Sequence, residues 1–224
     1  RFSDQESIDQ TDSYTVTANN TAGTQRLADG SRIMGAIKGR DAIYVWTDTA
    51  LFLMQFVGAP FTFSFQQVGT NCGLLGKNAC IEVDGAAYWM SENGFFTYDG
   101  QLKSMPCLVE DFVYDSINTT ARDLVNAGLN NLFGEITWFY CNSGSNVVNR
   151  QVTYNYLDST TQRPIWTTGS LARTAWQDSA VFGLPHATYY TASDNNSFDV
   201  TGNTDGTTIY YEQETGTDQV NAGG

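Results

Sequence analysis

Few residues in this 224-residue chain can support nucleophilic or metal chemistry, because it holds one histidine and four cysteines. A Ser/His/Asp or Cys/His mechanism would have to use His186, and no Gly-x-Ser-x-Gly turn accompanies it. The cysteines make no CxxC pair, which excludes the usual zinc spacings; they are Cys72, Cys80, Cys107 and Cys141. Four cysteines allow disulfides, but we expect buried, reduced residues that pack like small hydrophobes. We expect His186 to be structural or solvated.

Carboxylates are the next candidates, because 24 Asp and Glu residues stand against 11 Lys and Arg. A glycosidase needs two carboxylates that flank one bond. Acids lie near one another in sequence at Glu110-Asp111, Asp194/Asp199 and Glu212/Glu214. Residues 194–206 also carry Asp and Asn oxygens suited to calcium, without the spacing of an EF-hand. We expect most of these to be solvated turn residues, so the sequence predicts no catalytic, cofactor or metal site and no enzyme.

The charge balance excludes one broad class of function. A net charge of −13 and a pI near 4.2 lack the basic footprint of a nucleic-acid reader. With 41% hydrophobic and 16% charged residues the chain should fold, and its apolar runs are too short to span a bilayer. No signal-peptide pattern opens the sequence, and its start at Arg1 leads us to expect a processed or partial product.

The composition favours strands joined by tight turns. Aromatic residues make up 13% of the chain, and 21 Gly accompany only 4 Pro. Aromatic and β-branched residues favour strands, while Gly, Asn and Asp favour turns. We therefore predict an all-β protein.

A hairpin pattern recurs along the chain. The first copy spans residues 42–56, and residues 61–65 add a strand with one buried and one wet face. The second copy spans residues 85–99, about 44 residues further on, which is close to the period of propeller blades. Its turn is faintly similar to the structural Asp box of sialidase-type propellers, with Asn93 in place of the aspartate.

Two further copies are looser, at residues 135–156 and 186–212. Residues 105–132 interrupt the pattern, and we expect one or two short helices there, the second over residues 121–127 and ended by Gly128.

Recurring small sheets bury their faces best when they stack around an axis. We therefore predict a β-propeller region over residues 26–224, with four to five blades and short inter-blade helices. It would form either a small ring or a segment of a larger one. The polar residues 1–25 are predicted to be an extended arm with a short strand over residues 14–17.

Several dispersed segments resemble the β-propeller region of structural proteins from tailed bacteriophages. They are residues 1–4 (RFSD), 27–33 (LADGSRI), 45–51 (VWTDTAL), 88–90 (YWM), 96–100 (FTYDG), 138–140 (WFY) and 172–176 (ARTAW). The family is the tail nozzle or head-closure class of short-tailed phages, with members described as tail tubular protein B and packaged-DNA stabilisation protein. The resemblance covers residues 1–176, and members of that family are much longer than this chain.

The resemblance implies a non-enzymatic protein of the virion tail. It implies a ring, expected to be a hexamer, below the portal and adaptor proteins, with genomic DNA passing through it without sequence-specific binding. The net charge of −13 fits such a conduit, because an acidic wall repels phosphates; acidity that only keeps a protein soluble is the other interpretation. Two further hypotheses are a glycan-binding or glycan-degrading propeller that recognises a host receptor, and a cellular propeller scaffold for protein partners.

Overall fold

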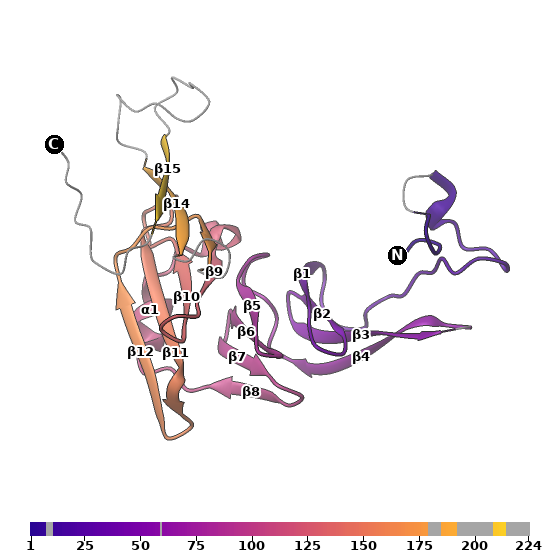
Figure 1. The fold of residues 1–224 in the computed structure, drawn as a ribbon, viewed down its shortest axis with the longest axis horizontal. Helices are drawn as coiled ribbons and strands as arrows, with labels where there is room; N and C mark the ends of the chain where they lie inside the picture. Colours follow the sequence, from indigo (N-terminus) through magenta and orange to yellow (C-terminus); the bar gives the residue numbers. More distant parts are fainter. Residues whose placement is uncertain (8–10, 59, 179–184, 192–207, 214–224) are drawn as a thin grey trace. The chain divides into compact units, whose positions relative to one another are not determined.

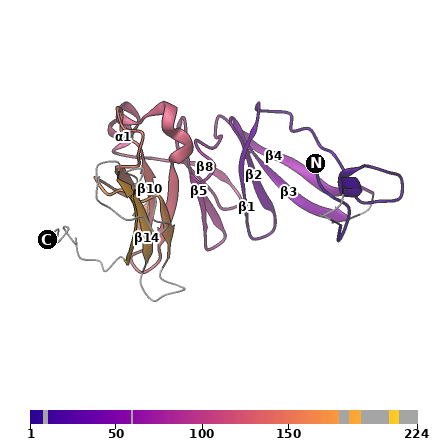
Figure 2. The same cartoon turned by 90° about the horizontal axis from the view of Figure 1, so that it is seen from above.

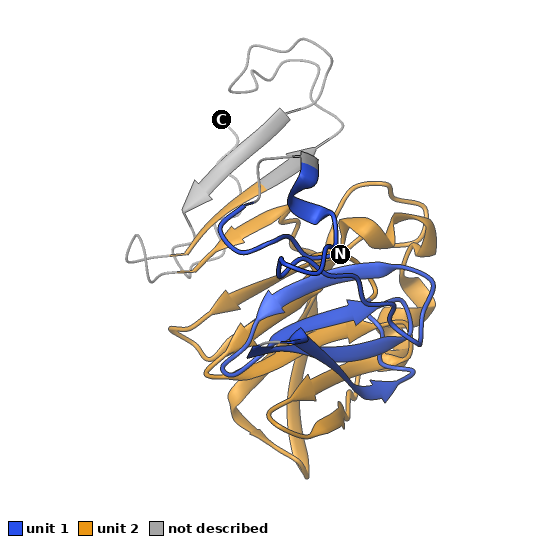
Figure 3. Cartoon of the chain, turned by 90° about the vertical axis from the view of Figure 1, so that its right-hand side faces the viewer, with its two compact units in different colours: residues 1–74 blue, residues 75–224 orange. Residues whose placement is uncertain are grey.

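The computed structural model describes residues 1–7, 11–58, 60–178, 185–191 and 208–213. Strands dominate the described chain and form four antiparallel sheets (Figure 1), which confirms the all-β prediction. The described helices are short: η1 (Thr11–Tyr14), α1 (Glu110–Ser116) and η2 (Thr119–Leu124). Contacts divide the chain into two compact units, Arg1–Leu74 and Leu75–Gly224 (Figure 3).

The first unit contains one four-stranded sheet in chain order. Its strands are β1 (Ile33–Lys38), β2 (Ile43–Thr47), β3 (Ala50–Gly58) and β4 (Thr62–Thr70). The apolar run that opens β3 is buried, and Val45, Ala50 and Phe52 form a small core with Leu27 and Met54 against it. The first predicted hairpin is therefore confirmed.

The second sheet opens the second unit and also runs in chain order. Its strands are β5 (Cys80–Val83), β6 (Ala86–Ser91), β7 (Gly94–Tyr98) and β8 (Leu102–Met105). Trp89 pairs with Phe96, just as Val45 pairs with Phe52 in the first sheet, 44 residues earlier. The equal register confirms the predicted offset between the two hairpins.

The third and fourth sheets continue the same order. The third comprises β9 (Asn126–Asn130), β10 (Glu135–Tyr140), β11 (Arg150–Thr160) and β12 (Arg163–Gly169). The fourth comprises β13 (Ala175–Gln177), β14 (His186–Thr191) and β15 (Thr208–Gln213). The strands predicted within both looser copies are confirmed, whereas sequence reasoning missed the first strand of each sheet.

The first strands of the sheets in the second unit lie beside one another. Strand β5 contacts β9, and β9 contacts β13. A parallel bridge joins Asn78, just before β5, to Asn126 at the start of β9, and the Ala127 N–H donates to the Asn78 carbonyl at 2.9 Å. Successive sheets therefore adjoin through the same edge.

Two local predictions are wrong. Residues 14–17 do not form a strand. The chain turns through η1 up to Tyr14, and the Asp4 backbone N–H donates to the Ser13 carbonyl within the arm. The helix expected over residues 121–127 ends as η2 at Leu124, and β9 begins at Asn126. Gly128 lies inside β9 because pairing with the second and third sheets overrides local propensity.

The alternating burial expected over residues 61–65 is also wrong. Phe61 precedes β4 and is 76% exposed, and Phe63, Ser64 and Phe65 are all half-buried. The cause is the length of β3, which continues to Gly58 although β2 pairs only with Leu51 to Met54. The far part of the β3–β4 hairpin is thus a two-stranded ribbon with no third strand to bury one face (Figures 1 and 2).

Candidate functional site

The residues with nucleophilic potential are placed as structural groups. His186 begins β14 and pairs in the ladder with Gln177 and Gln213. All four cysteines are free, Cys72 and Cys141 being buried. Cys80 and Cys107 are partly exposed to solvent. Burial of the Cys80 thiol still raises its pKa to about 12. Thiols in this state stay protonated at neutral pH and are poor nucleophiles.

The acid pairs do not converge in the described part of the chain. Glu110 and Asp111 lie in the first turn of α1, where carboxylates favour the helix N-terminus. Glu212 belongs to β15, whereas Asp194, Asp199, Glu214 and the loop at 194–206 lie outside the described residues. Among the described residues no group of three or more His, Cys, Asp or Glu side chains is placed to hold a metal ion.

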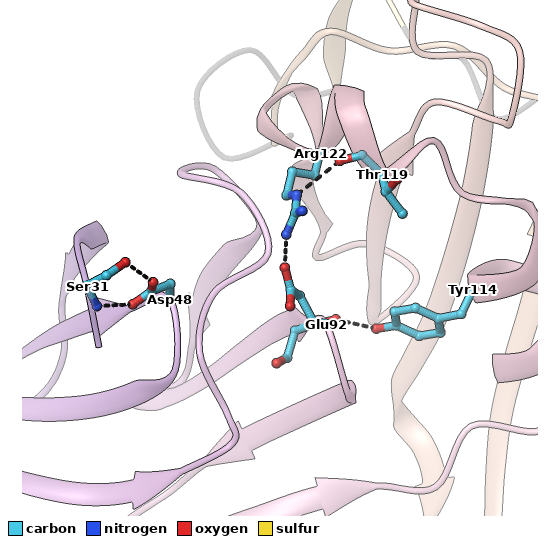
Figure 4. A network of polar contacts seen from close by, with 7 residues as sticks. Ser31, Asp48, Glu92, Tyr114, Thr119 and Arg122 are labelled. Carbon is cyan, nitrogen blue, oxygen red and sulfur yellow. Dashed lines mark hydrogen bonds and ion pairs between the residues drawn. The ribbon is translucent and has the colours of Figure 1, made fainter. Parts of the chain in front are cut away.

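The turn between β2 and β3 uses its acid to hold the chain that precedes β1. Asp48 Oδ1 accepts from the Ser31 backbone N–H at 2.7 Å, and Asp48 Oδ2 accepts from the Ser31 hydroxyl (Figure 4). These hydrogen bonds lower the pKa of Asp48 below its ordinary value. Thr47 closes the same turn, since its hydroxyl oxygen accepts from the Ala50 N–H at 2.9 Å.

The equivalent turn between β6 and β7 is held by residues that follow its sheet in the sequence. Glu92, which stands 44 residues after Asp48, forms an ion pair with Arg122 of η2 (Figure 4). The Tyr114 hydroxyl of α1 donates to the Ser91 carbonyl at 2.7 Å. Burial raises the pKa of Tyr114, so the phenol keeps the proton that it donates. Helices α1 and η2 therefore hold this turn in place through Tyr114 and Arg122, a role that residue spacing alone did not reveal.

An aromatic seam joins the second and third sheets. Phe95 of β7 is fully buried, and its ring centroid lies 4.7 Å from that of Trp166 and 5.0 Å from that of Trp138. The indole N–H of Trp138 donates to the Ala79 carbonyl at 3.0 Å, and that of Trp166 to the Pro106 carbonyl at 2.8 Å. Each buried indole thus donates to a carbonyl in the segments that flank the second sheet, while its ring packs between the two sheets.

A smaller seam joins the third and fourth sheets in the same way. Trp176 of β13 stacks on Phe139 with centroids 5.8 Å apart, and its indole N–H donates to the Leu129 carbonyl at 2.7 Å. Gly128 leaves room for this indole, since an added Cβ would lie 2.7 Å from Trp176 Cγ. The buried Asn126 amide also donates to the Arg173 carbonyl at 3.0 Å.

The N-terminal arm packs on the β3–β4 hairpin of its own unit. Phe2 and Gly23 exchange backbone hydrogen bonds, which closes the arm into a loop. The Phe2 ring meets Phe63 of β4 edge-on with centroids 5.0 Å apart, and the Thr62 hydroxyl donates to the Thr21 carbonyl at 3.3 Å. The described part of the arm therefore folds back on itself and lies against the hairpin.

A polar hollow of about 380 Å³ lies inside this arm. Its lining residues are Asp4, Ser7, Asp12, Ser13, Thr15, Thr17 and Asn20. Asp4 Oδ1 accepts from the backbone N–H and the hydroxyl of Thr21 at 2.8 and 2.7 Å, which lowers the pKa of Asp4. The carboxylate organises the loop and is not poised for proton transfer.

Comparison with known proteins finds no protein-family model and no curated protein that matches this chain. No helix among the described residues has the length and apolar character needed to cross a bilayer.

Proposed function

We propose that this chain is a structural, non-enzymatic protein of a bacteriophage tail, built as a β-propeller and acting by assembly. The observation that carries the proposal is the succession of antiparallel meanders in chain order, whose first strands β5, β9 and β13 adjoin. Propeller blades follow one another in this way around an axis. Blade number and ring closure are part of the proposal.

The described chemistry supports a mechanical role. Among the described residues, His186 serves a strand ladder, Glu110 and Asp111 open a helix, the cysteines are free and buried or partly buried, and four of the five tryptophans are buried. Large side chains join neighbouring sheets, as the hydrogen bonds donated by the indole N–H groups of Trp138, Trp166 and Trp176 illustrate. A protein that works by its shape needs rigid joints of this kind.

The net charge supports a conduit for DNA. A chain with a net charge of −13 repels phosphates, so a genome would slide past it without being held. In the proposed virion the chain would form a ring, expected to be a hexamer, next to the portal and adaptor proteins. Its N-terminal arm is positioned on an exposed hairpin, where it can contact a neighbouring subunit.

The glycan-recognition hypothesis requires exposed tryptophan or tyrosine rings on which sugars stack. Trp46, Trp89 and Trp138 are fully buried, and Tyr14 is the most exposed tyrosine among the side chains that the structure describes. No specific contact favours this hypothesis or the scaffold hypothesis over the tail protein.

The test is the solution state of the purified full chain. We expect light scattering after size-exclusion chromatography to give a multiple of 24.6 kDa, and negative-stain images to show a ring with a central channel. Duplex DNA should not be retained even at low salt, where electrostatic binding is strongest. A strictly monomeric protein that releases reducing sugar from bacterial polysaccharide would overturn the proposal.

A further inference from the structure

One stretch of this acidic chain carries no formal charge. Between Asp48 and Lys77 there is no Asp, Glu, Lys or Arg, although the whole chain has 24 acidic and 11 basic residues. This stretch contains strands β3 and β4, which form the uncharged hairpin, residues 50–70. The hairpin is therefore the part of the first unit with the least electrostatic cost of contact with another acidic surface.

The far end of the uncharged hairpin exposes large apolar side chains. Phe56 is 74% exposed, Val57 53% and Phe61 76%. The arm covers part of the ribbon, because Phe2 packs on Phe63, which in turn contacts Phe56 edge-on with centroids 5.8 Å apart. The arm leaves the three exposed side chains uncovered, and a cluster of this kind marks an interaction surface more often than a scattered single residue does.

Strand β4 lacks charge and proline, two of the devices that keep sheet edges from pairing, although one bulge at Val68 shifts its register with β3. It ends its sheet, has nine residues, and contains neither charge nor proline. The last strands of the next two sheets are protected: β8 has four residues with Lys103, and β12 begins with Arg163 and Pro164. A long uncharged edge is a template for another strand unless it is meant to be paired.

We infer that the uncharged hairpin is the surface through which one copy of this chain binds a second copy. Two copies that each carry −13 repel one another over most of their surfaces, and an uncharged hairpin on one copy lowers this repulsion against whichever face of the next copy it meets, as the head-to-tail contacts of a ring require. The exposed Phe56, Val57 and Phe61 supply apolar area, and the β4 edge supplies backbone donors and acceptors. The inference rests on the proposed assembly and names the surface that performs it.

The test compares two charges at one position in the full chain. Phe61→Glu adds a like charge to the contact and should weaken self-association by at least about tenfold in sedimentation velocity. Phe61→Lys removes the same ring but reduces the net charge, so it should weaken association less. The matched control is Leu108→Glu, which introduces the same charge at a side chain that is 80% exposed in the second unit and should leave association unchanged.

Unfolding in urea and far-ultraviolet circular dichroism would establish that each variant is folded, and Phe56→Glu repeats the test if Phe61→Glu does not fold. If the wild-type chain assembles and both hairpin variants assemble equally well, the inference fails while the proposed function stands. If the wild-type chain is a monomer at every concentration, the proposed function fails, and the inference that rests on it fails with it. Binding of a monomeric wild-type chain to neutral phosphatidylcholine vesicles, abolished by Phe61→Glu, would overturn the inference in favour of a lipid surface.

Discussion

Truncating Phe95 tests whether the aromatic seam holds the second and third sheets together. The ring is fully buried and contacts Trp166 and Trp138, which both belong to the third sheet. An aliphatic exchange of similar size costs below about 1.5 kcal/mol, and each aromatic pair lost, with Trp166, Trp138 and Tyr114 of α1, adds about 0.5–1.5 kcal/mol. We therefore expect Phe95→Leu to lower the free energy of unfolding by about 2 kcal/mol, and Phe95→Ala by about 4 kcal/mol because a cavity remains.

The assay is equilibrium unfolding in urea, followed by tryptophan fluorescence and by circular dichroism. Phe133→Leu is the matched control, because Phe133 is 53% exposed and the same exchange there should change the free energy by less than about 0.5 kcal/mol. Similar losses at Phe95 and Phe133 would contradict the burial on which the magnitude depends.

A double-mutant cycle asks whether the stabilisation crosses between sheets. Phe95→Leu and Trp166→Leu should be less than additive, with a coupling of about 1 kcal/mol, since each removes the same ring contact. Additivity within about 0.3 kcal/mol would refute the reasoning, because it would mean that the two sheets do not stabilise one another through this pair.

Three further predictions concern single contacts. Tyr114→Phe should lower the free energy of unfolding by about 1 kcal/mol in urea, because the Ser91 carbonyl loses its donor. Gly128→Ala should cost about 1–3 kcal/mol and perturb Trp176 fluorescence, because the new methyl group meets the indole. Asp48 has a lowered pKa, so its contribution is present above its unfolded value of 3.8 and is lost as pH falls through the folded value. In melting scans from neutral pH to below pH 3.8, Asp48→Asn should therefore lose less thermal stability than the wild-type chain; an identical acid dependence would contradict the role of Asp48.

The central hairpin strands could be predicted from the sequence because their signals are local. A run such as residues 135–140 combines aromatic and β-branched residues, and it forms β10 at the start of the third predicted copy. Strand β9 has the sequence NAGLN and no such signal; it exists because Ala127 donates to Asn78 and pairs along β10. Strands β9 and β13 are specified by contacts with neighbouring strands of the second unit more than by their own residues.

The residues that hold the turn between β6 and β7 could not be predicted from the sequence. The turn at Ser91 is similar in sequence to an Asp box, but its partners Tyr114 and Arg122 lie in α1 and η2, which follow the second sheet. No fixed spacing links those residues to the turn, because the segment that carries α1 and η2 is free to vary in length. The acid at Asp48 and the acid at Glu92 occupy equivalent positions, so their shared offset of 44 residues was the one available signal.

The uneven distribution of charge gives the acidic composition a physical meaning. The seams between sheets use aromatic rings and indole donors, and acids such as Asp48 and Glu92 hold turns at exposed or partly exposed positions. If acidity served solubility alone, charge would also be expected on the protruding hairpin, where Phe56 and Phe61 are exposed. Its absence from β4, the longest uncharged edge among the described strands, is what an acidic protein requires if copies are to meet at one place and repel elsewhere.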